Sequence, residues 1–157
     1  MNINIREFNN DDIDFILEMI KEGSSENVFR KFTKLNEKKF LDYLSKKEDY
    51  WLYVAVFDDE IIGYIDFELG IGGVGILLGI YVKKERRKKG IGTMLLNYAV
   101  KFLKEHCCHK IRTEVYSYNF SAKELCFKNK FFLEGILIND EYNRNLEILS
   151  RFFEEGE

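Results

Sequence analysis

The chain has 157 residues, a net charge of −3 and 46% hydrophobic residues, so we expect one domain over residues 1–157 with one substantial core. The acidic balance excludes the globally basic surface of a dedicated nucleic-acid binder, and no run approaches the ~20 apolar residues that span a bilayer. Residues 1–8 do not resemble a signal peptide. The three cysteines are odd in number and two are adjacent, which favours reduced thiols and a cytoplasmic protein.

The first half of the chain predicts a strand, two helices and a strand meander. Asn10–Asp12 offer N-cap chemistry for the first helix, and Gly23–Ser25 would end it. In chain order we expect a strand at 3–8, helices at 13–23 and 36–46, and strands at 51–57, 61–69 and 76–82.

The second half alternates helices with strands. It predicts a helix from residue 90 onward, a strand at 111–115, a short helix at 121–128, and closing strands at 131–138 and 146–153. This order indicates an α/β (α+β) domain, in which a mixed central sheet of about six to seven strands is flanked by helices.

The loop Arg87–Thr93 lies between a predicted strand and a predicted helix. The first N–H groups of a helix have no internal partner, and the helix dipole adds positive charge there, so such an end binds anions. Gly90 and Gly92 let a phosphate approach the backbone, and the run Arg87–Lys89 raises the local positive potential. The alternative is a solvated basic turn with a glycine cap.

Two motifs resemble those of the GCN5-related N-acetyltransferases, the GNAT family. The spacing Arg87-x-x-Gly90-x-Gly92, placed after Ile80–Val82, is similar to the family's acyl-CoA signature. A second block of the family matches in part at Asn119, Ala122, Leu125, Lys128 and Phe131. The expected element order agrees with the family over nearly the whole chain.

The resemblance implies that acetyl-CoA is the co-substrate. Backbone groups of Ile80–Val82 would pair with its pantetheine arm like an added strand, and N–H groups of Lys88–Thr93 would hold its pyrophosphate. Asn119 would contact the arm near the reacting end. The resemblance thus assigns to the cofactor Ile80, Tyr81, Val82, Arg87, Lys88, Lys89, Gly90, Ile91, Gly92, Thr93 and Asn119.

Acyl transfer to an amine needs a group that accepts the amine's proton. Glu114 is the leading candidate, because some family members are proposed to use a glutamate at this place through a water molecule. The alternative is a surface glutamate paired with a cation such as Arg112. Asp66 and Glu68 are weaker candidates on the neighbouring strand.

The family's usual general acid is a tyrosine, at the position that Cys126 occupies here. A thiol can donate a proton, but a small buried apolar residue is the alternative interpretation. Tyr116 and Tyr118 are nearby substitutes. Lys130 replaces the usual glycine before Phe131, which puts the local turn in doubt because lysine rarely takes positive φ.

Two other motifs are set aside. Gly70–Gly75 fits the dinucleotide fingerprint G-x-G-x-x-G, but a strand-like run follows where a helix is needed, so a turn between strands is expected. The run His106–His109 resembles a metal cluster, but adjacent ligands point apart, so we expect a helix end and no metal site.

The sequence therefore predicts an N-acetyltransferase that moves an acetyl group from acetyl-CoA directly to a primary amine on a peptide N-terminus or a small molecule. Two alternatives to an enzyme stay open. One is a non-catalytic acyl-CoA-binding or sensor module, and the other is a structural or interaction protein that binds no cofactor. The acceptor would bind between the first two helices and the C-terminal hairpin, and residues 23–32 would be mobile. Exposed apolar residues could also serve a homodimer. Carboxylates that would attract a cationic amine are Glu26, Asp66, Glu68 and Glu114.

Overall fold

The computed structural model describes residues 2–26, 34–45, 48–138 and 143–154. Its helices and longer strands are β1 (Asn4–Glu7), α1 (Ile13–Ser25), α2 (Lys34–Ser45), β2 (Tyr50–Phe57), β3 (Glu60–Gly70), β4 (Val74–Val82), α3 (Ile91–Glu105), β5 (Lys110–Tyr116), α4 (Phe120–Lys128), β6 (Phe132–Leu137) and β7 (Leu146–Phe152). The predicted order of elements is confirmed, and the bounds differ from prediction by a few residues at most.

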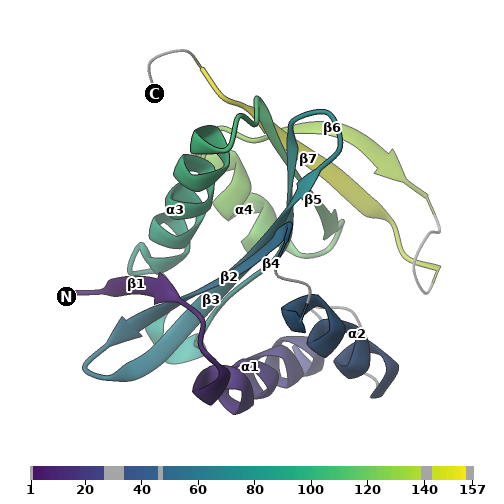
Figure 1. The fold of residues 1–157 in the computed structure, drawn as a ribbon. Helices are drawn as coiled ribbons and strands as arrows, with labels where there is room; N and C mark the ends of the chain where they lie inside the picture. Colours follow the sequence, from purple (N-terminus) through teal and green to yellow (C-terminus); the bar gives the residue numbers. More distant parts are fainter. Residues whose placement is uncertain (1, 27–33, 46–47, 139–142, 155–157) are drawn as a thin grey trace.

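The strands form one mixed sheet in the order β1-β2-β3-β4-β5-β7-β6. Among the described strands, β4 and β5 are the one parallel pair, and every other neighbouring pair is antiparallel. In Figure 1, α1 and α2 cover one face of this sheet, and α3 and α4 lie on the other. The predicted fold, a mixed sheet of six to seven strands between helices, is confirmed.

Each face of the sheet has its own apolar core. On one face, Ile16 and Met19 of α1 pack against residues such as Leu52 and Val54 of β2. On the other, the buried side of α3 packs on the sheet with residues of β2, β3, β4 and β5. Helical spacing of apolar residues explains both contacts, because i, i+3 and i+4 positions share one side of a helix.

Pairing between the central strands β4 and β5 stops partway along them. Their register covers Val74–Leu77 against Lys110–Thr113, although β4 runs on to Val82 and β5 to Tyr116. The Thr113 hydroxyl donates to the Leu77 carbonyl at 3.1 Å, at the last pair of this register. The sheet is therefore unpaired between these two strands beyond Leu77, and this opening positions the site described below.

The two motifs set aside from the sequence have structural roles. The Gly70–Gly75 run contains the predicted turn between strands: Gly70 ends β3, β4 begins at Val74, and Gly72 and Gly73 between them have positive φ. Helix α3 ends at Glu105, just before the His106–His109 run, which confirms the predicted helix end. Within the described ranges, no group of three or more potential ligand side chains is arranged to hold a metal ion.

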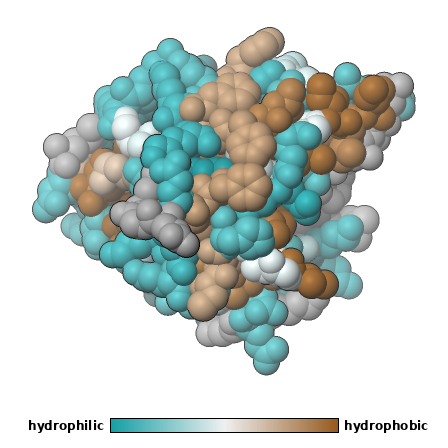
Figure 2. All heavy atoms as spheres, turned by 90° about the horizontal axis from the view of Figure 1, so that it is seen from above, coloured by the Kyte–Doolittle hydropathy of each residue, from teal (hydrophilic) through white to brown (hydrophobic). Residues whose placement is uncertain are grey.

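The C-terminal hairpin carries exposed apolar side chains. Figure 2 shows apolar side chains gathered in a band across the face seen from above. Exposed apolar residues of β6, β7 and the turn after β6 are Phe132, Leu133, Ile136, Ile138 and Phe152. Such surfaces are typical of interaction sites, but the homodimer stays a prediction.

No helix in the described part of the chain is long and apolar enough to span a bilayer.

Candidate active site at the opening between β4 and β5

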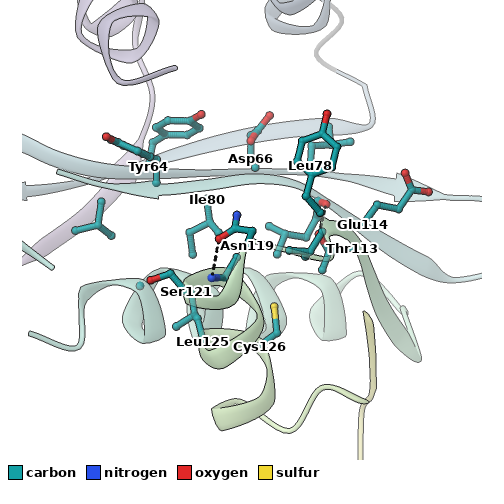
Figure 3. Close-up of a pocket in the computed structure, with 18 of the residues that line it drawn as sticks. Tyr64, Asp66, Leu78, Ile80, Thr113, Glu114, Asn119, Ser121, Leu125 and Cys126 are labelled. Atoms are coloured by element: carbon teal, nitrogen blue, oxygen red, sulfur yellow. Dashed lines mark hydrogen bonds between the residues drawn. The ribbon is translucent and has the colours of Figure 1, made fainter. Parts of the chain in front are cut away.

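A cavity of about 930 Å³ occupies the opening between β4 and β5. Its lining joins Gly90–Thr93 at the start of α3 with Asn119 and Cys126 of the α4 region, and it continues past the sheet to Tyr64 and Asp66. Figure 3 shows Asn119, Leu125 and Cys126 on one side of the strands, and Tyr64 and Asp66 pointing to the other side. The cavity therefore passes through the sheet from the α3/α4 face to the α1/α2 face.

The predicted anion-binding loop presents the uncapped start of α3. Lys88 and Gly90 have φ of 59° and 81°, which turns the backbone sharply before the helix. The Met94 N–H donates to the Gly90 carbonyl at 3.0 Å and closes the first helical turn. The N–H groups of Ile91–Thr93 precede that bond and have no carbonyl one turn earlier. With the helix dipole, they form a site suited to an anion.

Gly90 and Gly92 are needed for different reasons. Gly90 adopts a left-handed conformation that favours glycine, and a Cβ there would meet open space. A Cβ at Gly92 would lie 3.2 Å from a methyl carbon of Leu125, so this glycine lets α4 pack against α3. Asn129 joins the same two helices, because its Nδ2 donates to Thr93 Oγ1 at 3.3 Å and to the Leu125 carbonyl at 2.8 Å.

Arg87 anchors the loop to the rest of the domain. Its Nε donates to the Val82 carbonyl at 2.9 Å, and one terminal nitrogen pairs with Glu26 of the α1 end at 2.8 Å. The guanidinium also lies 5.0 Å from the ring centroid of Tyr81. The ion pair lowers the pKa of Glu26. Lys88 lines the cavity, whereas Lys89 does not, and the Lys89 ammonium donates to the Glu85 carbonyl.

Alternation along β4 decides which backbone groups face the opening. The Lys83 N–H donates to the Ile62 carbonyl of β3 at 2.9 Å. Because paired and outward-facing residues alternate in an antiparallel ladder, the Tyr81 backbone faces β3, whereas the backbones of Ile80 and Val82 face the opening. The Val82 carbonyl there accepts from Arg87. The edge that could pair with an extended ligand therefore centres on Ile80.

Asn119 and Cys126 line the cavity from the α4 side. The Asn119 side chain caps α4 by accepting from the Ala122 N–H at 3.2 Å. Cys126 is buried within the core of the α3/α4 face, and this burial raises the pKa of its thiol to about 12. Lys130 adopts φ of 67°, so the turn that its identity put in doubt is formed with lysine.

Glu114 lies on the other side of the sheet from Cys126. Thr113 and Val115 are buried, whereas Glu114 between them is exposed. Alternation along β5 therefore places Glu114 on the α1/α2 face, and Figure 3 shows its carboxylate pointing away from Cys126. Glu114 does line the cavity, as does Tyr116. Tyr118 stacks on Tyr116 outside the lining, with ring centroids 5.3 Å apart.

Asp66 is a buried carboxylate on the α1/α2 side of the cavity. One of its oxygens accepts from the Tyr50 hydroxyl at 3.0 Å, and burial raises the pKa of Asp66 to about 7. From the sequence, Asp66 is a weaker candidate than Glu114, and Tyr50 is not among the candidates. The available signal was an aspartate inside the otherwise apolar run 61–67 of a strand.

Residues of the elements between which the acceptor was expected line the far end of the cavity, and acceptor binding there stays a prediction. Ile20 of α1, Phe40 and Tyr43 of α2, and Leu146 at the start of β7 all line it. Of the segment 23–32 that was expected to be mobile, Gly23–Ser25 belong to α1, and residues 27–32 lie outside the described part of the chain.

One curated protein shares sequence with about half of this chain. Streptothricin acetyltransferase A of Bacillus subtilis (strain 168) is 29% identical over 84 residues, which cover 54% of this chain and 49% of that protein. The match thus spans about half the length of this curated relative.

Two solved structures share the fold over their whole length. The Ard1 structure from Thermoplasma volcanium has a TM-score of 0.84 and 22% identity, covering 99% of this chain and 100% of that one. A putative streptothricin acetyltransferase from Bacillus anthracis str. Ames, in complex with acetyl coenzyme A, has a TM-score of 0.79 and 20% identity, covering 98% and 100%.

The model of the acetyltransferase (GNAT) family matches residues 14–144, which include the loop before α3, the opening between β4 and β5, and α4. The chain belongs to the GNAT family of acetyltransferases.

Proposed function

We propose that this protein transfers the acetyl group of acetyl-CoA to a primary amine and releases the CoA thiol. The observation that carries the proposal is the cavity through the unpaired part of β4 and β5. It connects a helix start suited to an anion on one face with a buried carboxylate on the other. A thioester and an amine can thus reach the same point from opposite faces.

The residues of the α3/α4 face fit acetyl-CoA. The N–H groups of Ile91–Thr93 suit its pyrophosphate, and the edge at Ile80 suits the amide groups of its pantetheine arm. Lys88 adds positive charge to the same wall. The neighbour from Bacillus anthracis, which is bound to acetyl coenzyme A, supports this assignment.

The acceptor face suits a cationic amine. Aromatic rings of Phe40, Tyr43 and Tyr64 line it together with the carboxylates of Asp66 and Glu114. An ammonium is attracted both to aromatic faces and to carboxylates. The likeness to streptothricin acetyltransferases adds that antibiotic to the acceptors worth testing.

The test is acetyl-CoA turnover, measured by free-thiol release, with a panel of 1,4-diaminobutane, lysine, a peptide with a free N-terminus, kanamycin and streptothricin. We expect turnover with at least one of these amines and little without any amine. Isothermal calorimetry measures acetyl-CoA binding in parallel. Binding without turnover across the panel would instead favour the alternative, a non-catalytic acyl-CoA-binding or sensor module.

The chemical roles of Glu114 and Cys126 stay predictions. If Glu114 accepts the amine's proton, Glu114→Gln lowers kcat most at low pH, and an unchanged pH–rate profile removes it from the mechanism. The thiol of Cys126, with its raised pKa, holds its proton at neutral pH and lines the wall next to the cofactor face.

A further inference from the structure

We propose that Asp66 receives the ammonium of the acceptor and takes up its proton. This inference rests on the proposed acetyltransferase function and assigns the proton-accepting step to a residue outside both sequence motifs.

The carboxylate of Asp66 is held in one place by three features. It is 8% exposed and lines the cavity, so it is buried against protein but open to the site. Its Oδ2 accepts from the Tyr50 hydroxyl at 3.0 Å. Its Oδ1 lies over Gly79, where a Cβ would come within 2.6 Å of that oxygen, so only glycine leaves room for this position.

The strand geometry brings this carboxylate to the opening. The register between β3 and β4 shifts between Asp66 and Phe67, because Leu78 is an extra residue in β4. Leu78 and Gly79 follow the last β4 residue that pairs with β5, and both line the cavity. Asp66 therefore lies opposite the first β4 residues that do not pair with β5. This is the place where the cavity passes from one face of the sheet to the other.

The groups that face Asp66 favour a cation. Tyr50 of β2, with Tyr64 of β3 and Tyr43 of α2, supplies nearby aromatic rings, and the Tyr43 and Tyr50 centroids are 5.5 Å apart. Glu68 of β3 adds negative charge beside Asp66. Among the residues that the structure describes, the other charged groups lining this end of the cavity are Lys39 of α2 and Arg112 and Glu114 of β5, all exposed.

The proton affinity of Asp66 suits a base that works near neutral pH. Burial raises its pKa to about 7, and the hydrogen bond from Tyr50 opposes this rise. Proton transfer is most effective when the pKa of the base lies near the working pH. Glu114 is exposed to solvent, whereas the Asp66 carboxylate is buried at the opening between β4 and β5.

The step balances without a further reactant. The bound ammonium gives one proton to Asp66, and the neutral amine attacks the thioester carbonyl carbon to form a C–N bond. The C–S bond then breaks, and the sulfur leaves with the bonding electron pair. The second proton of the nitrogen goes to this sulfur through solvent, and Asp66 returns its own proton to water. The products are the N-acetyl amide, the CoA thiol and one released proton.

The test compares Asp66→Asn with the matched control Asp42→Asn, which makes the same change on the exposed side of α2. Kinetics use the panel amine that the wild-type enzyme acetylates fastest, starting with 1,4-diaminobutane. We expect Asp66→Asn to lower kcat/KM by about 100-fold or more, a typical size for losing a positioned base. Acetyl-CoA affinity by calorimetry should stay within about twofold, and Asp42→Asn should match the wild type.

The pH profile gives a second measurement that a merely structural role would not move. Wild-type kcat/KM should rise with pH through an acid limb near 7, and Asp66→Asn should lack this limb. Tyr50→Phe removes the hydrogen bond that lowers the pKa of Asp66, so it should move the limb to higher pH while keeping most of the activity at pH 9.

Three results would overturn the inference. One is wild-type turnover by Asp66→Asn, and the second is an acid limb that survives in Asp66→Asn but disappears in Glu114→Gln. The third is a limb that Tyr50→Phe leaves in place. A wild-type protein that binds acetyl-CoA but acetylates no amine of the panel contradicts the proposed function itself, a separate outcome that removes the basis of this inference as well.

Discussion

The two ends of the cavity are built from different parts of the polypeptide. On the α3/α4 face, the groups that would contact a ligand are main-chain N–H groups at the start of α3 and the edge of β4 near Ile80. On the α1/α2 face, they are side chains from separate elements, such as Tyr43, Tyr64 and Asp66. A main-chain site depends on local conformation, whereas a side-chain site depends on which elements pack together.

This difference predicts how each end responds to substitution. Changes at the start of α3 should affect the shared cofactor whichever amine is used. Changes around Asp66 should alter amine chemistry and leave cofactor binding intact. The variants below test this division, from the largest expected effect to the smallest.

The largest effect is expected for Gly92→Glu. The new side chain would crowd Leu125 and place a negative charge beside the N–H groups that suit a pyrophosphate. Like charges brought together in a binding site cost several kcal/mol, so acetyl-CoA affinity by calorimetry should fall by more than about 100-fold. Asn97→Glu adds the same charge to an exposed position of the same helix and should bind normally. Equal affinity in both variants would place the pyrophosphate elsewhere.

A pair of glycine variants separates backbone strain from ligand binding. Gly90 and Gly72 both have φ near 80°, and a Cβ at either would meet open space. Alanine at each should therefore lower the free energy of unfolding by about 1–2 kcal/mol, measured by urea denaturation. Only Gly90→Ala should also weaken acetyl-CoA binding, by roughly tenfold, because relief of the strain moves the N–H groups. A similar loss in Gly72→Ala would mean that general destabilisation explains the effect.

Asp66→Asn should make the protein more stable above neutral pH. The folded-state pKa of Asp66 is about 7, above the ordinary 3.8, so the folded wild type binds the extra proton between these values. The free energy of unfolding of the wild type, relative to that of the variant, therefore falls as the pH rises from about 4 to 7. Above about pH 7 the difference between the two proteins no longer changes. At pH 8 we expect a gain on the order of 2 kcal/mol, or roughly 4–8 °C in Tm. Equal Tm values at pH 8 would contradict a buried carboxylate.

Cys126→Ala should have the smallest effect on the reaction. The thiol is buried in the α3/α4 core, so its removal should lower the free energy of unfolding by about 1 kcal/mol through a small cavity. If packing is its main role, kcat should fall less than about tenfold, and Cys126→Ser should behave similarly. If kcat falls by more than tenfold in Cys126→Ala but stays near the wild-type value in Cys126→Ser, this position donates a proton.

The order of the elements could be predicted because each element is indicated by residues that are close together in the sequence. The apolar spacing of α1 and α3, the glycine turn after β3 and the polar run before α3 each depend on neighbours in sequence. The loop before α3 could be predicted for the same reason, because a glycine-containing helix start is a local feature of the sequence. Arg87 was expected to add charge there, but its pairing with Glu26 requires α1 to pack beside β4.

The acceptor end could not be predicted in the same way. Tyr50 and Asp66 are sixteen residues apart and meet only because β2 pairs with β3. Nothing in the sequence indicates that the missing Cβ of Gly79 makes room for the Asp66 carboxylate. Glu114 and Cys126 appear close in the chain, yet the alternation of β5 and the position of α4 put them on opposite faces of the sheet.

The sequence by itself determined the order of the elements and the helix start that suits a pyrophosphate, because periodicity, glycine and helix ends are local properties. Its two motifs indicated the family that the family model then showed. The tertiary structure decided where β4 parts from β5, which backbone groups face that opening and which carboxylate is buried beside it. Those features arise from strand register and from desolvation by packing, and both depend on residues that are distant in the chain.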